Sequence, residues 1–172
     1  KKILSSKEKK FTGHTEYIAH ACGLKGSEVM LLSNKKLNVA LATTHIAIKD
    51  VANNITQKSL CATISTLHHD LNKKFNITDP KITVTGLNPH SGENGEFGDE
   101  EIKIINPAIE KMKGLGVSIN GPVPADTAFT PKIMLKTDCY LAMYHDQGLA
   151  AFKALTFGRG VNVTLGLPII RT

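Results

Sequence analysis

The chain has 172 residues, of which 41% are hydrophobic and 21% charged, so it can bury one good core or two small ones and is not intrinsically disordered. It has no run of about 18 apolar residues and no start typical of a secretory signal, so we expect no membrane partner and a cytoplasmic location. The net charge of +6 suits small anionic ligands, whereas 5% aromatic residues and the lack of zinc-finger or RNP-like motifs argue against nucleic acid.

Two strands are predicted first, at 28–32 and 37–42, with a polar turn between them that indicates a hairpin. A helix is then predicted from the N-cap Thr56, because apolar residues recur at spacings of 4, 3, 4 and 4 from Leu60 to Phe75. A β-branched strand at 81–85 follows. The Gly- and Asn-rich loop after this strand is long enough to be functional.

A second helix is predicted at 102–112, with a kink at Pro107. Further strands are predicted at about 117–119, 139–144 and 161–165. Strands and helices in this order, joined by both hairpins and crossovers, predict an α/β fold with a mixed sheet. The apolar face of the second helix is expected to be Ile102, Ile105, Ile109 and Met112.

Three of the seven histidines, His45, His90 and His145, close or follow a strand-like run. Because neighbouring strands end within a few ångströms of each other, three such imidazoles can form a catalytic metal site with open positions for water or substrate. Their separations of 45 and 55 residues match no short metal-binding motif, so hydrogen-bonded polar histidines are the alternative interpretation. His68 and His69 are interpreted as helix-surface residues.

Asp126 and Asp146 are candidates for orienting the histidines or for proton transfer, although carboxylates beside histidines are as often structural. Thr15 is a reasonable helix N-cap, and a helix N-terminus is also an anion-binding position. A Lys and an Arg with an amide between them, as in Lys153, Asn162 and Arg171, suit a phosphate and a carboxylate. Taken alone, each of these residues can also be interpreted as an ordinary surface residue.

Four motifs carry a resemblance to a known enzyme family: Ala42-Thr-Thr-His45, Gly86-Leu-Asn-Pro-His90-Ser-Gly-Glu, Gly121-Pro-Val-Pro-Ala-Asp126-Thr and Tyr144-His-Asp-Gln-Gly148. They resemble the 4-hydroxythreonine-4-phosphate dehydrogenases of vitamin B6 biosynthesis. Family members extend beyond both ends of this chain, so we expect it to be incomplete. The resemblance implies that His45, His90 and His145 bind one divalent ion (Zn, Mg or Co) and that the substrate contacts are His14, Thr15, Lys153, Asn162 and Arg171.

The activity that the resemblance implies is oxidation of 4-phosphooxy-L-threonine with NAD or NADP, giving a β-keto acid that decarboxylates to 3-amino-2-oxopropyl phosphate. It also implies a homodimer with an active site shared between subunits. Two alternatives stay open. The first is a dehydrogenase of four-carbon acid sugar phosphates, such as threonate or erythronate 4-phosphate, and the second is a phosphate-binding module without redox chemistry.

The resemblance extends to the isocitrate and isopropylmalate dehydrogenases, which implies a two-lobed, non-Rossmann fold. Residues 1–138 would form a central α/β lobe with dimer and metal-site elements, and residues 139–172 would begin the return into the second lobe. The glycine spacing of Gly92, Gly95 and Gly98 agrees, since it differs from the G-x-G-x-x-G of a Rossmann domain. Family members commonly carry Gly-Gly-His-Met-Gly where this chain has Asn-Gly-Glu-Phe-Gly at 94–98. Because Glu96 stands in place of that His, no residue is assigned to cofactor contact.

Overall fold

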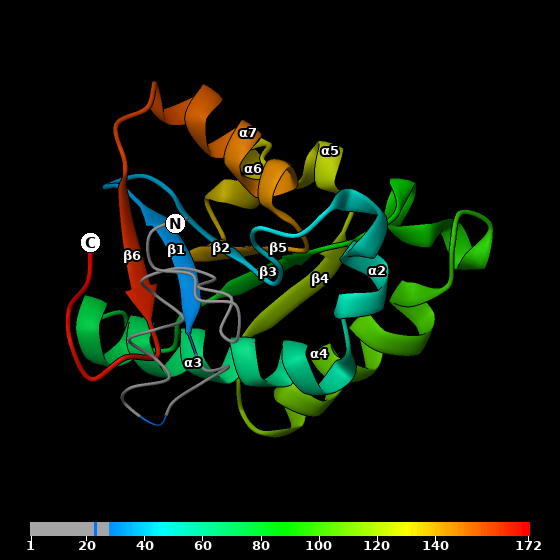
Figure 1. The fold of residues 1–172 in the computed structure, drawn as a ribbon, viewed down its shortest axis with the longest axis horizontal. Helices are drawn as coiled ribbons and strands as arrows, with labels where there is room; N and C mark the ends of the chain where they lie inside the picture. The colour runs from blue at the N-terminus through cyan, green and yellow to red at the C-terminus, as the bar shows by residue number, and fades with distance from the viewer. Residues whose placement is uncertain (1–22, 24–27) are drawn as a thin grey trace, which may run out of the picture.

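Residue 23 and residues 28–172 are described by a computed structural model, in which they form a six-stranded sheet with helices on both faces (Figure 1). The strands are β1 (Val29–Ser33), β2 (Asn38–Leu41), β3 (Ile82–Thr85), β4 (Ile119–Val123), β5 (Cys139–Ala142) and β6 (Val161–Leu165). Their order is β4-β3-β5-β2-β1-β6. The β4-β3, β3-β5 and β5-β2 pairs are parallel, whereas β1 is antiparallel to both β2 and β6. The predicted α/β class with a mixed sheet is therefore confirmed.

The predicted hairpin is formed by β1 and β2, with Leu31 opposite Ala40. Its turn is held by Asn34, whose side-chain oxygen accepts hydrogen bonds from the backbone N–H of Lys36 at 2.7 Å and of Leu37 at 2.9 Å. Asn commonly makes such local bonds in turns, because its short side chain can replace a backbone acceptor. The polar turn signal in the sequence thus has a direct structural cause.

One face of the sheet is covered by α3 (Gln57–Phe75) and α4 (Asn106–Gly114), as Figure 1 shows. Thr56 caps α3 as predicted, since its Oγ1 accepts a hydrogen bond from the backbone N–H of Ser59 at 3.0 Å. The predicted apolar stripe also faces the core. Burial of each of its large side chains stabilises the fold by about 1.5 to 3 kcal/mol. The fully buried members are Leu60, Ile64, Leu67 and Leu71.

The second predicted helix is composite: a one-turn π-helix, η4 (Glu101–Ile105), leads directly into α4. Ile105 and Ile109 are buried as expected, but the placement of Ile102 on the same face is wrong, since its side chain is 51% exposed. A π turn is wider than an α turn, so a three-residue step within it does not return to the same face. Pro107 lies in the first turn of α4, directly after this π turn, and its missing N–H cannot donate back into η4.

The opposite face carries α5 (Ala125–Ala128), α6 (Pro131–Met134) and α7 (His145–Thr156) (Figure 1). Close packing of α7 requires glycine at position 148. A Cβ atom there would lie 2.8 Å from Val39 Cγ1 and 2.9 Å from Ala142 Cβ. Gly148 therefore seats the first turn of α7 against β2 and β5, and this fixes where His145 leaves the sheet.

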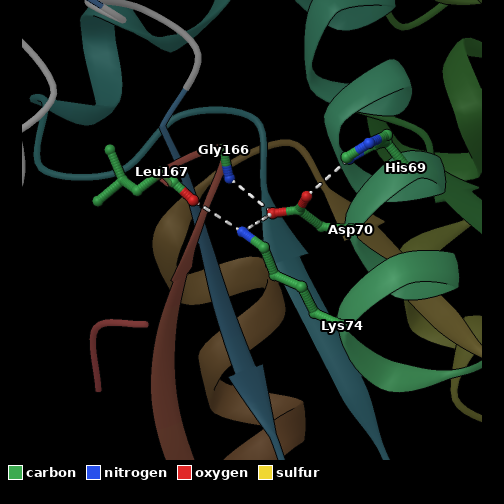
Figure 2. Close-up of polar contacts among 5 residues, drawn as sticks. All are labelled: His69, Asp70, Lys74, Gly166 and Leu167. Atoms are coloured by element: carbon green, nitrogen blue, oxygen red, sulfur yellow. Dashed lines mark hydrogen bonds and ion pairs between the residues drawn. The ribbon is translucent and has the colours of Figure 1, made fainter. Parts of the chain in front are cut away.

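Asp70 is a buried carboxylate that ties α3 to the chain leaving β6 (Figure 2). Its Oδ2 accepts hydrogen bonds from Lys74 Nζ at 2.7 Å and Gly166 N–H at 2.8 Å, and its Oδ1 lies 2.9 Å from His69 Nδ1. Lys74 also donates to the carbonyl of Leu167. Burial raises the pKa of Asp70, but the hydrogen bonds from Lys74, Gly166 and His69 outweigh it and hold the pKa below its usual value.

None of the described helices is long and apolar enough to cross a bilayer. Within the described residues, β5 and β6 belong to the same sheet as the first four strands, so this sheet continues across residue 138. The division into a central lobe and a second lobe stays a prediction for the longer protein.

Candidate functional site

His45 and His145 face each other at the carboxyl-terminal edge of the sheet. They follow β2 and β5, which are parallel neighbours, so the two segments that carry them leave the sheet at the same edge. The centroids of the two imidazole rings are 5.7 Å apart, with the ring planes tilted by 44°. Both rings line an open pocket of about 300 Å³. The other lining residues are Thr44, Ile46, Ile48, Val51, Tyr144 and Asp146.

Backbone contacts fix the two histidine segments to each other. Thr43 donates to the carbonyl oxygen of Met143 twice, from its backbone N–H at 3.1 Å and from its Oγ1 at 2.7 Å. Thr43 is buried, so these bonds are shielded from competing water. His45 and His145 each lie two residues beyond this clamp, and their relative position is therefore set by rigid structure.

His145 has an acidic partner in Asp146. The Nδ1 atom of His145 lies 2.7 Å from Asp146 Oδ1, and the Asp146 side chain is itself 87% exposed. A carboxylate on Nδ1 orients the ring and leaves Nε2 as the nitrogen with an available lone pair. This is the geometry expected of an orienting carboxylate.

Gln147 joins the ends of β3 and β5, a role that the sequence analysis did not assign. Its Oε1 accepts hydrogen bonds from Met143 N–H and Thr85 Oγ1, both at 2.7 Å, and its Nε2 donates to the Gly86 carbonyl at 2.8 Å. The one sequence signal was an amide inside a strand-to-helix turn that also carries His145. Gln147 thereby couples the His145 segment to the loop that leads to His90.

His90 lies in the loop after β3, within η3 (Pro89–Gly95), and its ring packs against Phe97 with centroids 5.9 Å apart. Within the part of the chain that the structure describes, no group of three or more His, Cys, Asp or Glu side chains is close enough to hold a metal ion. The structure therefore brings His45 and His145 together, and within one chain it does not add His90 to them.

The pair of imidazoles suits one divalent ion. With Zn–N bonds of 2.0–2.1 Å, two histidines on one ion have ring centroids roughly 5 to 6 Å apart. The observed separation of 5.7 Å agrees with this range. Catalytic zinc sites use three protein ligands, so in such a site His45 and His145 would be two of the three.

Three of the predicted substrate contacts lie away from this pocket. Lys153 is exposed on α7, and eight residues of helix place it roughly 12 Å from His145 along the axis. Asn162 is exposed near the start of β6, which β1 and β2 separate from β5 by roughly 14 Å. Arg171 is partly buried and donates to Thr164 Oγ1 at 3.1 Å. None of these three residues lines the pocket.

Of the remaining predicted site residues, the structure describes Asp126 but not His14 or Thr15. Asp126 is exposed in the first turn of α5, and it does not line the pocket either. His14 and Thr15 lie outside the described residues. The roles of all the predicted site residues therefore stay predictions.

Comparison with known proteins gives, over the whole chain, the family that the sequence motifs resemble. The family model described as pyridoxal phosphate biosynthetic protein PdxA matches residues 1–172. A 4-hydroxythreonine-4-phosphate dehydrogenase from Klebsiella pneumoniae is 42% identical with a TM-score of 0.85, over 92% of this chain and 47% of that chain. One from Burkholderia phymatum is also 42% identical, with a TM-score of 0.84, over 93% and 48%.

A more distant similarity is to a terephthalate 1,2-cis-dihydrodiol dehydrogenase from Burkholderia xenovorans LB400, at 28% identity and a TM-score of 0.83, over 92% of this chain and 50% of that chain. The chain thus spans about half the length of these solved relatives. The family match covers every residue, and the solved relatives share the fold. The chain therefore belongs to the PdxA family of pyridoxal phosphate biosynthetic proteins.

Proposed function

We propose that this chain is part of a divalent-metal-dependent, NAD(P)-linked dehydrogenase of vitamin B6 biosynthesis. Its substrate would be 4-phosphooxy-L-threonine, oxidised to a β-keto acid that loses carbon dioxide to give 3-amino-2-oxopropyl phosphate. Family membership and the 42% identical dehydrogenases support this reaction. The observation that carries it is the His45–His145 pair, clamped 5.7 Å apart at the edge of the sheet. We further propose a cytoplasmic enzyme with the two-lobed fold of the isocitrate dehydrogenases.

The chemistry of the site follows from its side chains. A divalent ion there would lower the pKa of the substrate hydroxyl and stabilise the oxygen while hydride passes from the adjacent carbon to the nicotinamide. His45 and His145 would hold the ion, and imidazole ligands suit Zn or Co better than Mg. Asp146 fixes the His145 ring through Nδ1. Asp126 and Asp146 are the proposed groups for taking the hydroxyl proton.

We propose that the site is completed across a homodimer, with the partner subunit's His90 as the third ligand. Two features support this. His90 does not join the pair within one chain, and apolar side chains are exposed beside both halves of the site. Such a surface, next to polar groups, is typical of subunit contacts. The exposed side chains are Ile46 (40%) and Ile48 (71%) beside His45, and Phe97 (46%) and Ile102 (51%) beside the His90 loop.

Mixing inactive variants of the full-length enzyme tests the shared site. A His45→Ala chain paired with a His90→Ala chain leaves one intact site per heterodimer, so an equal mixture should regain about a quarter of wild-type activity after random exchange. His45→Ala mixed with His145→Ala is the matched control. It should regain nothing, because both ligands come from the same subunit. Recovery in the control mixture, or none in the first, would contradict this arrangement.

Substrate recognition through Lys153 and Arg171 predicts a selective effect on KM. A lost charge-assisted contact costs about 1.5 to 3 kcal/mol, so Lys153→Ala and Arg171→Ala should each raise KM for the phosphorylated substrate roughly 10- to 100-fold. KM for NAD(P) should change little. Steady-state kinetics on the full-length enzyme measure both, with the exposed Lys58→Ala as a control. Equal changes in the two KM values would remove these residues from the substrate site.

A second candidate function is a dehydrogenase of another hydroxylated substrate. The similarity to the terephthalate dihydrodiol dehydrogenase favours it, because that protein is named for a substrate without phosphate. Within this alternative, the phosphorylated substrates to test are the four-carbon acid sugar phosphates. NAD(P)H formation with each substrate distinguishes the candidates. A protein that binds phosphate compounds and forms no NAD(P)H with any of them would be a binding module.

A further inference from the structure

We propose that Glu101 is a positioning residue that holds the loop bearing His90 in its binding geometry, an inference whose metal-binding part rests on the proposed function. Glu101 is 2% exposed. Its Oε1 accepts hydrogen bonds from the backbone N–H groups of Leu87 at 2.7 Å and Asn88 at 2.8 Å, and its Oε2 accepts one from Asn88 Nδ2 at 2.9 Å. The carboxylate thus binds the two residues that begin the loop.

The loop is also wrapped around this carboxylate from its other side. A Cβ atom at Gly86 would lie 3.1 Å from Glu101 Oε1, and one at Gly92 would lie 2.7 Å from Glu101 Oε2. Glycine at both positions leaves the space that the carboxylate occupies. His90 lies between the residues that contact Glu101, so its backbone position depends on these contacts.

The backbone that carries His90 needs such a restraint. From His90 to Asn94 every φ angle is positive, with 52° at His90 and 57° at Asn94. Gly92 adopts the left-handed region without steric cost and Asn94 with little, so the strain falls on His90, Ser91 and Glu93. Strained segments persist only where surrounding contacts over-determine them. The three hydrogen bonds that Glu101 accepts contribute to this restraint by fixing the start of the loop.

Glu101 differs from Asp70, the other buried carboxylate, in its partners. Asp70 pairs with Lys74, whereas no ion pair to Glu101 is formed by the described residues. Amide groups donate to its carboxyl oxygens instead. A side chain of this kind is costly to bury for stability alone, which agrees with a role in shaping the loop.

The test uses the full-length protein with Glu101→Gln and Glu101→Ala, and Glu110→Gln as an exposed control in the following helix. Hydrogen exchange of the loop amides, Zn²⁺ affinity by titration, and thermal stability are measured for each. Glu101→Ala should expose the Leu87 and Asn88 amides, speeding their exchange at least about tenfold, and should weaken Zn²⁺ binding roughly 10- to 100-fold. Glu101→Gln should show a smaller change, because its remaining oxygen still accepts both N–H groups. Glu110→Gln should match wild type.

Unchanged loop exchange in both Glu101 variants would overturn the inference, as would lost protection without any change in Zn²⁺ affinity. If Glu101→Ala fails to fold, Glu101→Gln gives the same comparison with the side-chain shape preserved. Wild-type protein that binds no Zn²⁺ would overturn the proposed function and the metal-binding part of this inference. Hydrogen exchange would still decide whether Glu101 holds the loop, so the two failures are distinguishable.

Discussion

Replacing either His45 or His145 with alanine is expected to lower kcat/KM of the full-length enzyme by at least about a hundredfold, since even the groups that only orient metal ligands are worth 10- to 100-fold. The physical reason is the loss of one imidazole from a pair whose rings are 5.7 Å apart. Metal content by elemental analysis should fall together with activity. Steady-state kinetics and metal analysis on the same samples provide the measurement.

His68→Ala is the matched control for these two variants, because His68 lies on α3 and is not among the residues that line the pocket. It should keep its metal and its activity. Should the His45 and His145 variants retain full metal content, the pocket would not be the metal site. Loss of metal without loss of activity would instead separate metal binding from catalysis.

Replacing Asp70 with alanine is expected to lower the free energy of unfolding by about 2 to 3 kcal/mol, because the N–H of Gly166 and the ammonium of Lys74 lose a buried partner. His69→Ala, which removes only the exposed contact to Asp70, should cost under about 1 kcal/mol. Urea unfolding of the full-length protein measures both. Equal losses in the two variants would show that the buried contacts in Figure 2 contribute nothing beyond the exposed one.

Asp70 also predicts a pH dependence of stability. The pKa of Asp70 is lower in the folded protein than its ordinary value, so the carboxylate contributes fully at pH values above about 4, the pKa of an unfolded Asp. The contribution is lost as the pH falls through the lowered pKa of the folded state. The stability difference between wild type and Asp70→Asn should therefore shrink below about pH 4. A difference that stays constant down to pH 2 would contradict the lowered pKa.

The regular elements were predictable because their signals are local. The 4, 3, 4, 4 spacing of apolar residues and the N-cap Thr56 define α3 without any knowledge of its neighbours, and the Asn34 turn defines the hairpin. Ile102 shows where this reasoning ends. Its periodicity assumes α geometry, whereas residues 101–105 form a π turn that the spacing of apolar residues does not reveal.

The site was predictable only in part, for the same reason. Parallel strand ends explain why His45 and His145 meet, and their positions after strand-like runs, together with their motifs, indicated both residues. Gln147 was missed because its contacts join residues far apart in sequence, such as Thr85. Glu101 was missed because its partners Leu87 and Asn88 lie 14 and 13 residues earlier, beyond the spacing of a turn or helix contact. Their polar side chains are ordinary for a helix start, and burial was the information that the sequence lacked. We propose that the third ligand comes from a second subunit, and the sequence of one chain does not show how two subunits meet.

We propose that His45 and His145 of one subunit and the partner subunit's His90 bind a single divalent ion. Anomalous diffraction from crystals of the full-length protein grown with Zn²⁺, collected at the zinc absorption edge, tests this claim. One peak per subunit is expected between the His45 and His145 rings, with three nitrogen ligands at about 2.0 to 2.3 Å, the third from the partner. A peak away from these rings, or no peak with Zn²⁺ in excess, would contradict the claim. Three ligands drawn from one subunit would contradict its shared form.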